Sequence, residues 1–348
     1  MIIIANSISI SRFKGAPKRE RIFRAQVKRG ILSVLILGAI LASTASASTP
    51  GCPDCPDWIN FNDWWDKYHT DSSEADSGSS PSDIREQALK SRGLDDENLT
   101  ANAEYAAPEL LVSSRDDLKG RVLLDARSPS DYENGHLPGA RNLYWKSVKP
   151  KGTLDPEVAV EELCRLGVNE TDSIVVYGNG DDSAYLFWAL EYLGQNDLAR
   201  LDGNVEAISD LELVQNAPEP EKSNYTSVVR QGLLVNESML EQAQGSLGVQ
   251  IVDTRSSFSD YAVSRVSNSM HVKTADLYSD PEARTLKDAG ELEKIFSGRG
   301  LDEEKVQMVY GTPEACTLYF ALRTMGYKVT VLDGNWWQKT NYAVSSIS

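Results

Sequence analysis

Positive charge is scarce in this chain once its first 48 residues are set aside. Those residues hold eight of the 35 lysines and arginines but one of the 51 acidic residues, so the remaining 300 residues have a formal net charge of −23. A surface of this sign repels the phosphates of DNA and RNA and the headgroups of anionic membranes. We therefore predict no nucleic-acid partner, and solubility is the simplest role for the acidity.

A long apolar run is also missing. The apolar stretch at residues 31–42 is shorter than the roughly 20 residues that a helix needs to cross a bilayer. It follows a basic stretch and precedes small residues that include Ala45-Ser46-Ala47, which is the order found in a signal peptide. We predict that residues 1–48 are a signal peptide or, alternatively, an uncleaved N-terminal membrane tether. Either case predicts an exported protein, extracellular or in the cell envelope.

Cysteine is rare, with four in the chain. Cys52 and Cys55 form a Cys-x-x-Cys motif, but no second cysteine pair supports a zinc site, although His69 lies nearby. Pro53 and Pro56 argue against a redox motif, which normally opens a helix after a strand. A local disulfide or two free thiols is the favoured interpretation, a redox or metal module is the alternative, and no cofactor is predicted.

Residues 49–107 are expected to form an acidic, partly disordered linker. Segment 71–82 is polar and rich in serine and acid, so it cannot bury enough apolar surface to offset the entropy of ordering. An aromatic cluster precedes this segment, and we expect it to dock on the chain's own domains. Its members are Trp58, Phe61, Trp64, Trp65 and Tyr68.

From about residue 108, short apolar runs alternate with helical stretches, which is typical of a parallel sheet with helices on its faces. Three strand-like runs recur in the same order about 130 residues later: residues 122–125, 173–177 and 199–202 correspond to residues 249–253, 306–310 and 329–333. The repeat predicts two α/β domains, at residues 108–215 and 228–348. A proline-rich, charged connector at residues 216–227 joins them.

Residues 125–142 read DARSPSDYENGHLPGARN, which resembles the signature of the rhodanese family. The second copy keeps a degraded form of it from Asp253, and the segments 201–203 and 332–336 resemble the family's closing motif. The resemblance spans about residues 108–348 and points to the tandem-domain thiosulfate and mercaptopyruvate sulfurtransferases. It implies an α/β fold of two tandem rhodanese-like domains, each with a central parallel sheet flanked by helices.

The resemblance also implies a chemistry. In the family, a cysteine follows the fourth strand in a tight loop that opens a helix, where backbone N–H groups and the helix dipole favour its thiolate. The thiolate takes a sulfur atom from a donor as a persulfide and passes it to an acceptor. This chain has glycine at the corresponding position of both loops, and we expect the loops' acids to face an anionic donor. The degenerate loops are Gly178, Asn179, Gly180, Asp181 and Asp182, and Gly311, Thr312, Pro313 and Glu314.

Cys316 is the remaining candidate nucleophile, because the start of the following helix would lower its pKa. We interpret it instead as a buried structural thiol. The leading hypothesis is an exported, catalytically degenerate rhodanese-like protein that binds an unknown protein or small-molecule ligand. The alternative is an active sulfurtransferase that uses Cys316. His136, Arg127 and Arg255 are expected to have structural roles, the arginines as partners of nearby acids.

Overall fold

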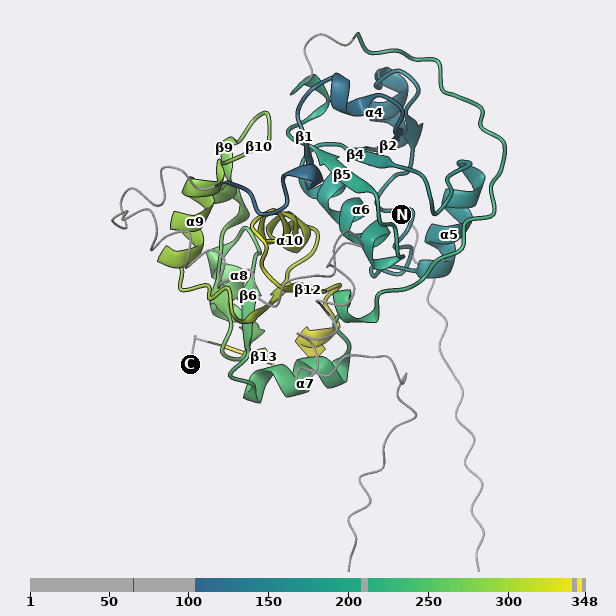
Figure 1. Cartoon of the computed structure of the whole chain (residues 1–348). Coiled ribbons are helices and arrows are strands. Elements are labelled where there is room, and N and C mark those ends of the chain that lie inside the picture. Colours follow the sequence, from purple (N-terminus) through teal and green to yellow (C-terminus); the bar gives the residue numbers. More distant parts are fainter. Residues whose placement is uncertain (1–64, 66–103, 208–211, 340–342, 346–348) are drawn as a thin grey trace, which may run out of the picture. The chain divides into compact units, whose positions relative to one another are not determined.

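The computed structural model describes residue 65 and residues 104–207, 212–339 and 343–345 (Figure 1). These residues belong to one compact unit, Gly51–Ser348. The predictions for residues 1–48, for Cys52 and Cys55 and for most of the linker lie outside the described residues.

The first domain is built on a five-stranded parallel sheet. The strands lie in the order β1 (Leu111–Val112), β5 (Leu198–Leu201), β4 (Ile174–Tyr177), β2 (Val122–Asp125) and β3 (Arg141–Asn142). Every residue of β4 and β5 is buried, as expected for parallel strands that are covered on both faces. The connecting helices are α4 (Pro129–Asn134), α5 (Pro156–Arg165) and α6 (Asp181–Tyr192).

The second domain repeats this plan with a four-stranded parallel sheet. Its order is β12 (Val329–Leu332), β11 (Val306–Tyr310), β6 (Val249–Asp253) and β8 (Met270–His271). Its helices are α7 (Glu237–Gly245), α8 (Phe258–Val263), α9 (Ala289–Gly298) and α10 (Glu314–Thr324). Two antiparallel pairs complete it: β9 (Tyr278–Asp280) with β10 (Thr285–Leu286), and β7 (Arg265–Val266) with β13 (Ala343–Val344).

Short 3₁₀ helices connect these elements: η1 (Pro108–Leu110), η2 (Asp116–Leu118), η3 (Val205–Ala207), η4 (Gln231–Leu233), η5 (Thr274–Leu277) and η6 (Trp336–Lys339). Among the described residues, no helix is long and apolar enough to cross a membrane.

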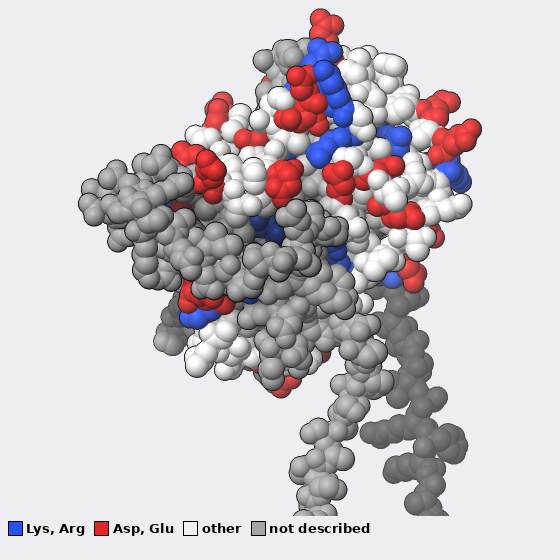
Figure 2. Space-filling model, in the orientation of Figure 1, with Lys and Arg blue, Asp and Glu red and all other residues white. Residues whose placement is uncertain are grey.

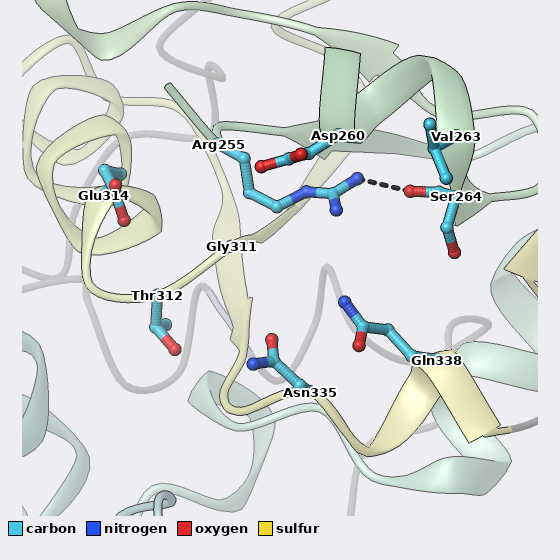
Figure 3. Close-up of a pocket in the computed structure, with 9 residues that line it drawn as sticks. All are labelled: Arg255, Asp260, Val263, Ser264, Gly311, Thr312, Glu314, Asn335 and Gln338. Atoms are coloured by element: carbon cyan, nitrogen blue, oxygen red, sulfur yellow. Dashed lines mark hydrogen bonds between the residues drawn. The ribbon is translucent and has the colours of Figure 1, made fainter. Parts of the chain in front are cut away.

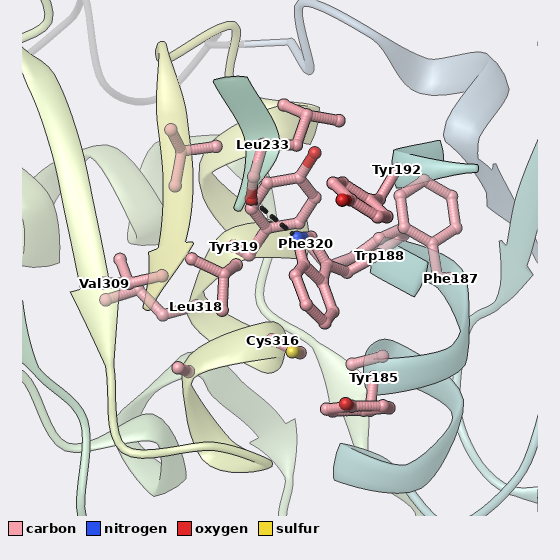
Figure 4. Close-up of a cluster of buried hydrophobic side chains, with 14 of the residues drawn as sticks. Tyr185, Phe187, Trp188, Tyr192, Leu233, Val309, Cys316, Leu318, Tyr319 and Phe320 are labelled. Atoms are coloured by element: carbon pink, nitrogen blue, oxygen red, sulfur yellow. Dashed lines mark hydrogen bonds between the residues drawn. The ribbon is translucent and has the colours of Figure 1, made fainter. Parts of the chain in front are cut away.

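Helices α6 and α10 pack against each other and join the two domains (Figure 4). The rings of Phe187 and Phe320 meet edge to face, with 5.0 Å between their centroids. Glu191 accepts hydrogen bonds from Tyr319 Oη and Arg323 Nη2, each at 2.7 Å, so the buried charge is paired. Both helices are buried on nearly all sides, which explains why their sequences lack a polar face.

The predicted fold class is therefore confirmed. The six repeated strands form where the apolar runs predict them, to within one residue at each end. Helix α6 begins at Asp181, three residues before the predicted start at residue 184. The structure describes one member of the aromatic cluster, Trp65, which is 5% exposed and lies with its ring centre 5.4 Å from the Arg323 guanidinium carbon. In Figure 2, acidic side chains are spread over the described part of the visible face.

Candidate functional site

In the first domain, backbone N–H groups at the loop between β4 and α6 bind the carboxylate of Asp182. Asp182 Oδ1 accepts hydrogen bonds from the backbone N–H groups of Asn179 and Ser183, each at 2.6 Å. A Cβ atom added to Gly178 would lie 2.5 Å from that oxygen. The donors that could cradle an anion at the start of α6 are thus used by Asp182, and its carboxylate fills the space beside residue 178.

The acids of this loop do not face an incoming donor as we expected. Burial raises the pKa of Asp182, and hydrogen bonds from Ser183 and Asn179 oppose that rise. Asp181 turns toward the second domain, where its carboxylate accepts a hydrogen bond from Thr317 Oγ1. Asp182 therefore caps its own loop, and Asp181 contributes to the contact between α6 and α10.

The loop between β11 and α10 is crowded at its glycine. Gly311 has φ of +98°, a conformation that residues with a side chain rarely adopt. A Cβ atom added there would lie 2.7 Å from Arg255 Cγ and 3.2 Å from Thr254 Oγ1. Position 311 is therefore closed to cysteine by both backbone conformation and space.

A cavity of about 590 Å³ opens beside this second loop (Figure 3). Its lining comes from four places in the chain that the sheet topology brings together. The loop between β11 and α10 contributes Gly311, Thr312 and Glu314, and Arg255 follows β6. Helix α8 contributes Asp260 and Val263, and Ser264 follows it directly. Asn335 and Gln338 come from the segment after β12.

Arg255 is the cationic side chain of the cavity lining, and its charge is already paired. Its Nη2 lies 2.6 Å from Asp253 Oδ2, and the same nitrogen donates to the carbonyl oxygen of Ser264. Burial lowers the pKa of Arg255, but the hydrogen bond and charge of Asp253 outweigh it and raise the pKa overall. The guanidinium carbon also lies 5.2 Å from the ring centre of Trp337. Arg255 therefore holds the fold together, as predicted, and offers little positive charge to a ligand.

Glu314 begins α10 and faces the same cavity (Figure 3). Burial raises the pKa of Glu314, and the negative charges of Asp181 and Asp253 raise it further. A hydrogen bond from its own backbone N–H opposes this shift. The second loop thus also presents a carboxylate at the start of its helix.

Cys316 lies within α10, away from the cavity lining. Its side chain is fully buried and points toward α6, where Tyr185 lies (Figure 4). Burial raises the pKa of the thiol well above its ordinary value, and the charge of Asp333 adds to the rise. This direction is opposite to the lowering that we expected from the helix start, because burial disfavours the charged thiolate. Its position agrees with the interpretation as a structural thiol.

The other residues expected to be structural have such roles. Arg127 Nη2 lies 2.6 Å from Asp125 Oδ2 and also donates to the carbonyl oxygen of Gly135. His136 is fully buried; its Nδ1 lies 2.9 Å from the carbonyl oxygen of Tyr132, and the two rings stack at 3.8 Å. Within the described residues, no group of three or more His, Cys, Asp or Glu could hold a metal ion.

Asp333 is a buried acid that the sequence reasoning missed. Tyr185 Oη and Thr312 Oγ1 each donate to it at 2.8 Å, and Lys149 Nζ lies 3.3 Å away. It thereby links the second loop to the first domain. The sequence signal was weak, because Asp333 stood only as part of a closing motif and its partners lie up to 184 residues away.

The model of the rhodanese-like domain matches residues 108–211 and 237–339. The chain belongs to the rhodanese-like family. One of the two matches lies in each of the two α/β domains.

Several curated proteins are similar to this rhodanese-like chain. A putative thiosulfate sulfurtransferase of Synechococcus elongatus is 26% identical over 71% of this chain and 85% of its own length. The sulfur carrier protein TtuD of Thermus thermophilus is 25% identical over 67% of this chain and 94% of its own length. The 3-mercaptopyruvate sulfurtransferase of Escherichia coli is 24% identical over 61% of this chain and 83% of its own length. A tandem-domain, sulfurtransferase-like family is thus supported.

Solved structures agree on the fold. SseA of Escherichia coli matches with a TM-score of 0.58 and 24% identity, covering 65% of this chain and 98% of its own. Wild-type EanB matches with a TM-score of 0.58 and 16% identity, covering 63% of this chain and 61% of its own.

Proposed function

We propose that this protein is a catalytically degenerate tandem rhodanese that acts by binding. The observation that carries the proposal is that neither loop has a thiol and that a side chain at either glycine would displace a neighbouring side chain. At Gly178 the obstacle is the carboxylate of Asp182, and at Gly311 it is the side chain of Arg255. In the rhodanese family the persulfide forms on a cysteine at this position, where loop donors can stabilise it.

The charge of the second cavity also disfavours the donors named for the relatives. Thiosulfate and mercaptopyruvate are anions, whereas the cavity is lined by Asp260 and Glu314 and by an arginine paired with Asp253. Two like charges about 4 Å apart repel by about 1 kcal/mol in water and about 4 kcal/mol at the effective dielectric of a protein surface. An anionic donor would therefore bind weakly beside Glu314.

Sulfur transfer through Cys316 is the alternative function. A nucleophilic thiol must be ionised and reachable by its substrate. Burial raises the pKa of Cys316, and its side chain is 0% exposed between the domains. The burial of Cys316 therefore supports a binding role over sulfur transfer.

A steady-state assay tests the proposal. The full chain is offered thiosulfate or mercaptopyruvate as donor, with cyanide or a small thiol as acceptor, and the Escherichia coli 3-mercaptopyruvate sulfurtransferase serves as the positive control. We expect no turnover above the enzyme-free rate. Turnover that is lost in Cys316→Ala would contradict the proposal and establish Cys316 as the nucleophile.

We propose further that the protein is exported. The support is the order of basic, apolar and small residues within residues 1–48. N-terminal sequencing of the native protein after cell fractionation tests this. Recovery outside the cytoplasm with a new N-terminus near Ser48 is expected for a signal peptide, and an intact chain in the membrane fraction for a tether. Recovery of the intact chain in the cytoplasm would refute export.

A further inference from the structure

We propose that a small monovalent anion of the size of chloride binds beside the turn at Gly180, where the guanidinium groups of Arg200 and Arg284 and the hydroxyl group of Tyr278 come together. The first domain supplies Arg200, and the second domain supplies the other two side chains. The site is separate from the cavity of the second domain, and the inference goes beyond the proposed binding function.

Arg200 is a buried cation with a donor that has no partner. It lies in β5 and is 0% exposed. Its Nε donates to Ser183 Oγ at 3.0 Å, and its Nη2 donates to the carbonyl oxygen of Gly180 at 3.4 Å. Its Nη1 is buried and has no hydrogen-bond partner among the described residues. Because a buried charged donor is costly to leave unpaired, Nη1 is the group that a bound anion would satisfy.

Other arginines of the two domains have carboxylate partners. Nη2 of Arg127 and of Arg255 lies 2.6 Å from a carboxylate oxygen, and Nη2 of Arg323 lies 2.7 Å from one. Neither Arg200 nor Arg284 forms an ion pair with any of the described residues. These two side chains are therefore positive charges with which an anion can still pair.

Both arginines lie close to the hydroxyl group of Tyr278. A Cβ atom added to Gly180 would lie 3.1 Å from Tyr278 Oη and 3.3 Å from Arg284 Cγ, and Arg200 bonds the carbonyl oxygen of the same glycine. Burial raises the pKa of Tyr278, and the charges of Arg200 and Arg284 oppose that rise. Tyr278 Oη lies 3.5 Å from Thr317 Oγ1, which is long for a hydrogen bond, so its O–H group can donate to a ligand.

Three acids lie near this group, and each accepts hydrogen bonds from other donors. Asp181 accepts from a threonine of α10, Asp182 from its own loop, and Asp202 from a backbone N–H group of β10. None of them forms an ion pair with Arg200. At longer range they repel a divalent anion about twice as strongly as a monovalent one, which favours an anion of single charge.

The enclosure of the donors limits the size of the anion. Arg200 Nη1 is buried and Tyr278 is 3% exposed, so a bulky oxyanion would have to separate the two domains. Chloride is monatomic and accepts hydrogen bonds from N–H and O–H donors alike. Because its donors come from both domains, a bound chloride ion would stabilise their contact.

Thermal unfolding of the full chain in sodium chloride and in sodium gluconate at equal ionic strength tests this inference. Gluconate is also monovalent but is too large for an enclosed site. We expect the unfolding midpoint to be higher in chloride by about 2 °C or more at about 0.3 M salt. Broadening of the chloride-35 NMR line by the protein measures the binding directly.

Variants of the protein locate the binding. Arg200→Met removes the buried charge and should abolish the difference between the two salts, whatever it does to the midpoint itself. Arg284→Met and Tyr278→Phe each remove one donor and should at least halve the difference, and they keep the test valid if Arg200→Met does not fold. The matched control is Arg299→Met, since Arg299 lies in the same domain and pairs with Asp276 at 3.2 Å. This control should keep the full difference.

Two outcomes would overturn the inference. The first is an equal midpoint in chloride and gluconate together with an unchanged chloride NMR line, which is the result expected if water satisfies Arg200 Nη1. The second is a chloride effect of full size in Arg200→Met, or in both Arg284→Met and Tyr278→Phe, which would place the ion elsewhere. Neither outcome bears on sulfur transfer, so the proposed function stands or falls separately.

Discussion

Replacing Gly311 with alanine adds one carbon atom where the second loop turns. The φ of +98° is strained for any residue with a side chain, at a cost of about 1–3 kcal/mol. The new Cβ would also lie 2.7 Å from Arg255 Cγ, so Arg255 must move and weaken its hydrogen bonds to Asp253 or Ser264. Losing one such bond costs about 1–3 kcal/mol. We expect a total loss of about 2–6 kcal/mol in the free energy of unfolding.

Urea denaturation of the full chain measures this loss, and two further variants divide it. Gly300→Ala has a positive φ of +77° but no atom within 4 Å of the added Cβ, so it reports backbone strain alone. Gly311→Cys should be destabilised at least as much as Gly311→Ala and should gain no sulfur transfer. The reasoning is refuted if Gly311→Ala costs no more than Gly300→Ala, since the contact with Arg255 would then carry no energy.

The remaining predictions concern the carboxyl group of Asp182, the thiol of Cys316 and the interface between α6 and α10. The pKa of Asp182 is raised in the folded state, so the folded protein binds more protons and this acid lowers stability as pH rises from about 4; Asp182→Asn should flatten that decline in urea denaturation. In alkylation of the native protein, Cys316 should react far more slowly than the half-buried Cys164, and equally fast after unfolding. Phe320→Ala should cost about 3–5 kcal/mol in thermal or urea unfolding, because the ring is fully buried against Phe187.

The strands and the duplication could be predicted from the sequence because parallel strands that are covered on both faces are continuous apolar runs. Residues 174–177 and 306–310 are buried at every position, and each leads directly into a glycine. The degenerate loops could be located for the same reason, since the resemblance fixes where each strand ends.

The roles of the loop side chains could not be predicted, because they depend on contacts that spacing does not encode. Asp182 was expected to face a donor, but the turn at Gly180 directs its carboxylate back to the loop's own N–H groups. The burial of Cys316 depends on α6, which comes from the other domain. Asp333 gains Lys149 and Tyr185 only when the two domains pack together.

The position of Asp182 also changes how the first loop is understood. From the sequence, the acids of this loop indicated only that an anionic donor would be repelled. In the structure, one of them occupies the helix-start donors and the space beside Gly178. The loop is therefore closed by its own side chain, and removal of a charge alone would not restore a persulfide site.

The most direct test of the central claim is the intact mass of the full chain after incubation with thiosulfate or mercaptopyruvate and removal of the excess donor. A working rhodanese keeps one transferred sulfur atom as a cysteine persulfide. The account predicts that the mass of this chain stays unchanged under conditions in which the Escherichia coli 3-mercaptopyruvate sulfurtransferase gains a sulfur atom. A gain of one sulfur atom that is lost in Cys316→Ala would contradict it.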